Sequence, residues 1–157
     1  MPSHPVQPPE WIEAAPIRVE ESVDIAATAE AVWGHIADHE RWPTWFEDID
    51  KVEITGMATG VGGNRRVTAK RLPIDEEFTV WKENEEFAFA VIGTKLPFLS
   101  TMAESVRLEP SDGVCRVVYR QGLHARHGFG WLLNLLWKPA PGQLRRALAN
   151  LKTLAEQ

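Results

Sequence analysis

Glu104 is the side chain in this sequence whose type and position most readily suggest chemistry. In the strand-like run 102–108 it shares a face with three apolar residues, Met102, Val106 and Leu108. A carboxyl group in such a row is buried with a raised pKa, or paired with a cation or a polar ligand group, for which Arg66, Arg71 and Arg107 are candidates. The simpler alternative is a strand-end carboxylate that reaches water or a salt bridge. Glu21 has the same phase in the run 17–25 and poses the same choice.

Tyr119 is the only tyrosine, and it shares a strand face with Val117, Gln121 and Leu123. A buried phenol needs a hydrogen-bond partner, and Gln121 beside it would form a small polar spot on an apolar wall. Such a spot either orients a ligand or belongs to an ordinary core.

The histidines form two pairs. His124 and His127 flank a short segment ahead of the C-terminal helix, where an imidazole could act as acid or base, or simply lie in a solvated loop. We favour the loop, because nothing in the sequence orients either ring. His35 and His39 are spaced for a metal on one helix, but Pro43 and a cap-like Asp38 place them across a helix junction without a third ligand. We therefore expect no metal, and treat both as surface or capping residues.

Composition excludes several classes of function. The chain has 157 residues, enough for one domain with a sizeable core, and a net charge of −5, which gives nucleic-acid binding little support. Cys115 is the only cysteine, so no internal disulfide forms and a reducing cytoplasm fits. The Gly60–Gly63 loop does not precede a helix, and no other motif predicts a cofactor. Residues 1–16 contain five prolines but no apolar core, which predicts a flexible tail rather than a signal peptide or membrane span.

Most of the chain reads as strands separated by turns. Period-two alternation predicts a strand over Ile17–Ile25, and six further runs follow, at 51–55, 63–72, 74–83, 87–93, 100–108 and 114–123. Between the first two strands, Thr28 is a suitable N-cap for a helix that ends near Ala37, and a second short helix runs from Asp38 to about Phe46. In 74–83, Phe78 and Val80 fall on one face and Thr79 and Trp81 on the other.

The C-terminal third is helical. Gly142–Gln157 carries a stripe of leucines that should pack on the sheet, Leu144, Leu148, Leu151 and Leu154. The preceding segment, 128–137, is apolar almost all round, so we expect it to be covered on more than one side. It could be a cavity wall and gate, plain core or a dimer contact, or a site of transient membrane contact.

The order of these elements resembles the START-like helix-grip superfamily (SRPBCC), and its nearest branch is similar to the polyketide cyclase/dehydrase and lipid-transport group. The resemblance is carried by Ile25-Ala26, by Val32-Trp33, by the run 37–45 (ADHERWPTW), and by Asp112-Gly113 before the strand Cys115–Tyr119. It covers residues 17–156. It implies an α+β fold in which a curved seven-stranded antiparallel sheet wraps around a long C-terminal helix, with two short helices between strands 1 and 2.

The resemblance also implies an elongated, mostly apolar cavity between sheet and helix. The expected protein is a flexible tail over 1–16 and a ligand-binding domain over 17–157 that takes up a lipid, polyketide-like or isoprenoid-like molecule. The expected ligand-binding residues are Trp45, Phe78, Val80, Phe87, Phe89, Met102, Glu104, Val117, Tyr119, Gln121, Trp131 and Leu135.

Two other classes of function remain open. One is a cyclase or dehydratase that uses the same cavity without metal or nucleotide, with Glu104, Tyr119 or His124 as its acid or base. The other is an interaction protein with a filled cavity. In each case we expect a cytoplasmic monomer or homodimer that binds no nucleic acid and does not insert stably into membranes.

Overall fold

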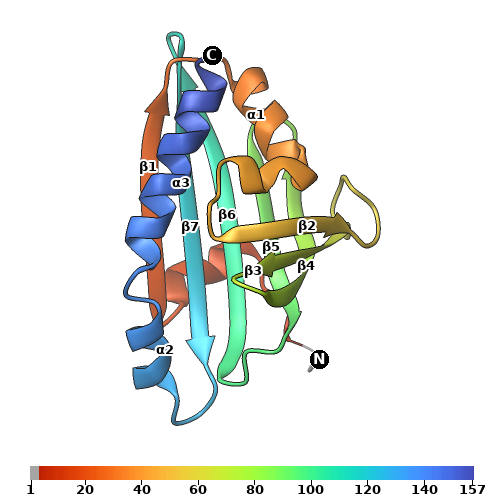
Figure 1. Cartoon of the computed structure of the whole chain (residues 1–157), viewed down its shortest axis with the longest axis vertical. Coiled ribbons are helices and arrows are strands. Elements are labelled where there is room, and N and C mark those ends of the chain that lie inside the picture. The colour runs from red at the N-terminus through yellow and green to blue at the C-terminus, as the bar shows by residue number, and fades with distance from the viewer. Residues whose placement is uncertain (1–3) are drawn as a thin grey trace.

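The computed structural model describes residues 4–157 and contains a single antiparallel sheet (Figure 1). The strands are β1 (Ile17–Ile25), β2 (Ile49–Ile54), β3 (Asn64–Ala69), β4 (Leu72–Lys82), β5 (Glu86–Thr94), β6 (Leu99–Ser111) and β7 (Val114–Ala125). Their order is β1-β7-β6-β5-β4-β3-β2, so every strand from β2 to β7 pairs with its neighbour in sequence and β1 closes onto β7. The predicted seven-stranded α+β helix-grip architecture is confirmed.

Apart from η1, which lies in the segment expected to be a flexible tail, the helices occupy the predicted places. They are η1 (Pro9–Ala14), α1 (Ala29–Ala37), η2 (His39–Thr44), α2 (Gly130–Leu136) and α3 (Ala140–Ala155), where η denotes a 3₁₀ helix. The Thr28 hydroxyl accepts a hydrogen bond from the Ala31 N–H at 3.1 Å, which is the predicted N-cap of α1. No helix within residues 4–157 is long and apolar enough to cross a membrane.

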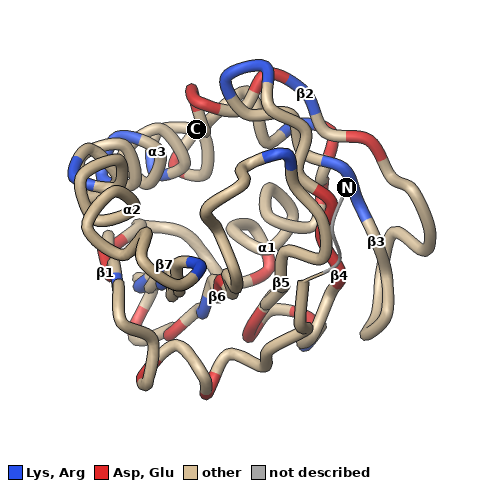
Figure 2. The backbone as a smooth tube through the Cα atoms, turned by 90° about the horizontal axis from the view of Figure 1, so that it is seen from below, with Lys and Arg blue, Asp and Glu red and all other residues tan. Residues whose placement is uncertain are grey.

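Helix α3 lies against the concave face of the sheet. Seen from one end, the strands follow an arc from β1 round to β2, and α3 lies between the two ends of that arc (Figure 2). The inner face of α3 consists of three buried leucines, as their spacing predicts: Leu144, Leu148 and Leu151. Arg145 donates to the Glu21 carboxylate of β1, so Glu21 forms a salt bridge rather than entering the interior.

A bulge in β4 changes the side-chain phase that simple alternation predicts. Phe78 pairs with Phe89 and Val80 with Ala88, which leaves Thr79 as an extra residue on β4. The rings of Phe78 and Trp81 consequently stack on each other, with centroids 5.8 Å apart. The two aromatic residues therefore share one face, although alternation placed them on opposite faces.

The predicted flexible tail is wrong for residues 4–16. Ile12 of η1 is buried, and the segment packs across β6 and β7, where Gly122 leaves room for it: a Cβ there would approach the Ile12 Cα to 3.0 Å. His4 is also buried, and its Nε2 lies 3.0 Å from the Leu99 carbonyl. Proline-rich composition without periodicity hid these contacts, and residues 1–3 lie outside the described part of the chain.

Ile12→Ala should lower the free energy of unfolding by about 2 kcal/mol, because it removes buried apolar surface and leaves a cavity against β7. Urea denaturation of the variant and of Glu10→Ala, an exposed position on the same helix, provides the comparison. Equal stability of all three proteins would show that this segment adds nothing to the fold.

The expectation that the apolar segment 128–137 is covered on more than one side is also wrong. Within α2 only Leu133 is buried, whereas Trp131 is 69% exposed and Leu135 51% exposed. The helix has one face on the sheet and a second, apolar face in solvent.

Candidate functional site

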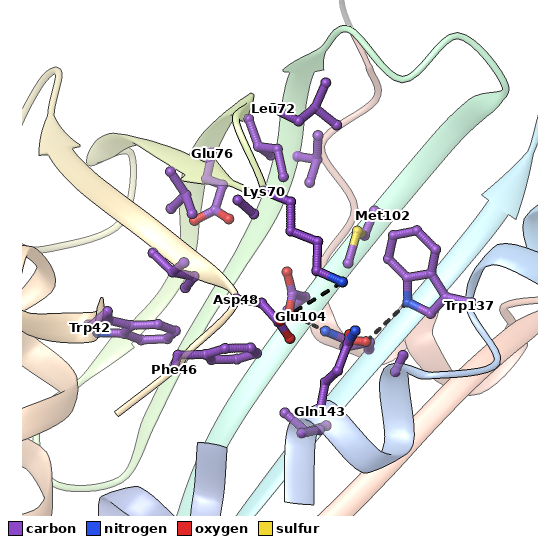
Figure 3. A pocket seen from close by; sticks show the side chains of 18 of the residues that line it. Trp42, Phe46, Asp48, Lys70, Leu72, Glu76, Met102, Glu104, Trp137 and Gln143 are labelled. Carbon is purple, nitrogen blue, oxygen red and sulfur yellow. Dashed lines mark hydrogen bonds and ion pairs between the residues drawn. The ribbon is translucent and has the colours of Figure 1, made fainter. Parts of the chain in front are cut away.

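A pocket of about 400 Å³ lies between the concave face of the sheet and the helices (Figure 3). Strands β3 to β7 each send alternate side chains into it, because residues two apart lie on the same face of a strand. Helices α2 and α3 and the segment from η2 to β2 close its other sides. Its lining is mostly apolar and includes Trp42, Phe46, Ile49, Val67, Leu72, Ile74, Phe89, Val91, Met102 and Trp137.

Glu104 is the centre of a polar cluster within this wall. Its Oε1 accepts hydrogen bonds from the Tyr119 hydroxyl and the Gln121 Nε2, each at 2.9 Å. Glu104 and Gln121 are direct partners in the β6–β7 register, so the sheet itself brings them together. Trp137 Nε1 donates to Gln121 Oε1 at 3.3 Å, which extends the cluster to the end of α2.

The pKa of the Glu104 carboxyl lies close to neutral pH. Burial raises its pKa to about 7, the nearby Glu76 carboxylate adds to the shift, and the two hydrogen bonds oppose it. Burial and Glu104 also raise the pKa of Tyr119 well above its usual range, so the phenol stays a donor. Glu104 can therefore either accept a proton or donate one to a molecule in the pocket.

Arg65 of β3 and Glu76 of β4 form a second buried pair, beyond β5 from Glu104 in the same sheet. Arg65 Nε donates to Glu76 Oε2 at 2.6 Å, and the two side chains are only 1% and 5% exposed. The guanidinium lies over the Trp42 ring at 4.1 Å and the Phe89 ring at 4.7 Å, a cation–π arrangement. Burial raises the pKa of Glu76, and the adjacent Arg65 opposes that shift.

His39 is a buried part of this cluster, so its assignment as a surface or capping residue is wrong. Its Nε2 lies 2.8 Å from the Ala58 carbonyl, to which it donates, which leaves Nδ1 to accept from Arg65 Nη1 at 3.2 Å. Burial and the Arg65 charge lower the pKa of His39 to about 4, so the ring stays neutral. His39 thus orients Arg65 and does not face the pocket.

The mouth of the pocket carries its exposed residues. Lys70, in the turn between β3 and β4, reaches across the opening to Asp48, with Nζ 3.8 Å from Oδ1 (Figure 3). Leu136 of α2 also lines the pocket and is 47% exposed. The pocket therefore has a polar interior cluster, apolar walls and a mouth that combines one lysine with exposed apolar surface.

The structure places five of the predicted site residues on the pocket wall: Phe89, Met102, Glu104, Tyr119 and Gln121. The others lie elsewhere. Phe78 and Phe87 pack with His39 in an aromatic core, Trp45 lies buried against Trp42 and Phe46, and Val117 is buried in the main core. Val80 is half-buried on the bulged strand, and Trp131, Leu135 and His124 face solvent.

The site residues predicted from the sequence did not include three that line the pocket: Trp42, Arg65 and Glu76. The signal that identified Glu104 was present for both charged residues. By spacing, Arg65 shares a strand face with Val67 and Ala69, and Glu76 shares one with Ile74 and Phe78. Their strands are neighbours joined by a short turn, and Arg65 is the direct register partner of Glu76. A search for charged residues in apolar rows on adjacent strands would have found the pair.

No group of three His, Cys, Asp or Glu side chains in residues 4–157 is arranged to hold a metal ion. The polar side chains that line the described pocket carry carboxyl, phenol, amide, indole, ammonium and guanidinium groups.

Comparisons with known proteins agree on family and fold. Solved structures with the same fold include the Zhui aromatase/cyclase from a Streptomyces species, with a TM-score of 0.73, 18% identity and coverage of 89% of this chain and 93% of that one. A START superfamily protein from Mycobacterium smegmatis has a TM-score of 0.70 at 15% identity and covers 87% and 98%. An uncharacterized protein of Mycobacterium tuberculosis is 31% identical over 151 residues, covering 90% of this chain and 86% of that protein.

The family described as "Polyketide cyclase / dehydrase and lipid transport" matches residues 16–156, which include every strand and all of the pocket lining. The chain therefore belongs to the polyketide cyclase/dehydrase and lipid-transport family.

Proposed function

We propose that this protein binds a hydrophobic or amphipathic small molecule in the pocket between the sheet and α3. The observation that carries the proposal is an apolar pocket of about 400 Å³ with one compact polar cluster, Glu104, Tyr119 and Gln121, on its wall. The family, which includes lipid-transport proteins, and the aromatase/cyclase with the same fold support it. Each methylene group that moves from water into the pocket would contribute about 0.8 kcal/mol to binding.

The charges inside the pocket restrict the polar part of the ligand. Glu76 and Glu104 are two carboxyl groups, and Arg65 is the one buried cation lining the described pocket. An anionic group beside Glu104 would be repelled, whereas a hydroxyl or carbonyl oxygen could accept a hydrogen bond from the protonated carboxyl. We therefore propose that the interior receives a neutral hydroxyl or carbonyl group and that any acidic group stays near Lys70 at the mouth.

Ala69→Trp should abolish this uptake, because the indole would fill the pocket beside its mouth, where Ala69 lies. Titration with the neutral fluorescent dye Nile red should show saturable one-to-one binding to the unmodified protein, and at least about tenfold weaker binding to the variant. Ala149→Trp, at an exposed position of α3, is the matched control and should bind normally. Equal binding by both variants, or no binding by any of the three, would contradict the proposal.

A second candidate function is supported by Glu104 itself. A buried carboxyl with a pKa of about 7, hydrogen-bonded to a phenol in an apolar pocket, is suited to general acid–base catalysis, as a cyclase or dehydratase requires. Of the three predicted candidates, His124 faces solvent, away from this pocket. If the protein catalyses a reaction of a poly-β-keto thioester, Glu104→Gln should lose turnover while Nile red binding persists. A variant that keeps both turnover and Nile red binding would contradict a catalytic role for Glu104.

We also propose a cytoplasmic location, where the buried thiol of Cys115 would remain reduced. Fractionation of the source cells with an antibody against the protein tests this location.

A further inference from the structure

The end of the molecule that carries α2 has an unusually exposed apolar surface. Phe129, Trp131, Leu135 and Leu136 are 44%, 69%, 51% and 47% exposed. Phe98, in the turn between β5 and β6, lies beside them, with its ring centroid 6.3 Å from that of Phe129. We call these five residues the α2 surface. Exposed apolar side chains grouped in this way indicate a contact with another apolar phase or molecule.

The charges that flank the α2 surface along the chain are of one sign. No Asp or Glu occurs between Glu86 and Glu104, or between Asp112 and Glu156, although the whole chain has a net charge of −5. The loops and helix ends beside the α2 surface carry Lys95, Arg126 and Lys138, all exposed. Figure 2 views the molecule from this end, with α2 and the end of β7 toward the viewer.

The α2 surface is continuous with the pocket. Leu136 belongs to both, and its neighbour Trp137 and the turn residue Leu96 also line the pocket. Trp137 donates to Gln121 of the polar cluster, so α2 connects the surface to the interior. Anything that covered the α2 surface would lie at the pocket mouth.

We propose that the α2 surface docks on an anionic membrane, with Trp131 and its apolar neighbours inserted at the level of the headgroups and Lys95, Arg126 and Lys138 on lipid phosphates. Apolar side chains surrounded by cations combine the two interactions by which peripheral proteins bind such membranes. A second copy of the chain fits less well, since a symmetric contact through this surface would bring two sets of cations together.

Flotation with lipid vesicles, without any pocket ligand, tests the proposal. The protein should float with phosphatidylcholine vesicles that contain about 30% phosphatidylglycerol, and much less with phosphatidylcholine alone or at about 0.5 M salt. Trp131→Glu combined with Leu135→Glu should weaken this binding at least about tenfold. The control, Met57→Glu with Val61→Glu, also changes two exposed apolar residues but in the loop between β2 and β3, and should bind normally.

The outcomes separate this inference from the proposed function. Ala69→Trp, which should lose Nile red binding, should still float with the anionic vesicles. Three results would overturn the docking proposal. The first is no flotation of the unmodified protein, and the second is an equal loss of vesicle binding in both double variants. The third is an unmodified protein that does not bind vesicles but forms a dimer on sizing chromatography, which only the Trp131/Leu135 variant disrupts. Circular dichroism confirms that each variant is folded.

Discussion

Glu104→Gln should raise the free energy of unfolding by about 3 kcal/mol at about pH 8 and by less than about 1 kcal/mol at about pH 5. The carboxyl is buried, and its pKa in the folded protein is raised to about 7 from an ordinary value of 4.5. Above that pH the folded protein must hold a carboxylate in an apolar wall. The amide keeps an oxygen that can accept the Tyr119 and Gln121 hydrogen bonds and carries no charge.

The sign of the pH dependence follows from the direction of the pKa shift. A carboxyl whose pKa is raised on folding stabilises the folded state below its unfolded pKa and loses that contribution as the pH rises from about 4.5 through 7. Urea denaturation of both proteins across this range measures the difference. Glu83→Gln, at an exposed position between β4 and β5, is the control. If Glu104→Gln instead lowered the free energy of unfolding at about pH 8, the buried carboxylate would stabilise the folded protein, which contradicts this prediction.

Arg65→Met should lower the free energy of unfolding by about 3–4 kcal/mol at about pH 8, since it leaves the Glu76 carboxylate buried without its cation. It also removes the donor to His39 Nδ1 and the contact with the Trp42 ring. The loss should be smaller at about pH 5, because an unpaired Glu76 can then take up a proton. Thermal or urea unfolding at the two pH values provides the measurement.

Two further variants show whether the pair itself is responsible. Combining Arg65→Met with Glu76→Leu should recover much of the lost stability, because no unpaired charge remains in the interior. Arg66→Met is the matched control: Arg66 is the next residue of β3 and pairs with Asp75 at 2.6 Å, but its side chain is 43% exposed, so the loss should stay below about 1 kcal/mol. Similar losses for Arg65→Met and Arg66→Met would contradict the special role of the buried pair.

The fold was predictable from the sequence because its signals are local. Alternation defined β1, the Thr28 cap defined the start of α1, and the leucine stripe defined the buried face of α3. The motif in 37–45 added the order in which these elements assemble. The packing of η1 was not predictable in this way, since the contact of Ile12 with Gly122 joins residues more than a hundred positions apart.

The site was predicted in part, for a similar reason. Alternation placed Glu104 correctly on an apolar face, but it could not reveal that the β6–β7 register sets Gln121 opposite Glu104. It failed for Phe78 and Trp81, because the bulge at Thr79 shifts the phase within β4. It missed Arg65 as the interior cation, since the residues considered as partners of Glu104 were other arginines.

The exposed residues of α2 show a different limit. An all-apolar helix is normally buried, so Trp131 and Leu135 were assigned to a cavity wall, whereas the structure turns both toward solvent. Only Leu136 and Trp137, at the end of this segment, reach the pocket.

Native mass spectrometry of the purified protein, combined with organic extraction, tests the central claim of a small-molecule pocket most directly. We expect an apolar or amphipathic molecule bound one-to-one, or uptake of one equivalent of added Nile red by the empty protein, and neither with Ala69→Trp. An unmodified protein that carries no such molecule and takes up no apolar probe would contradict the account.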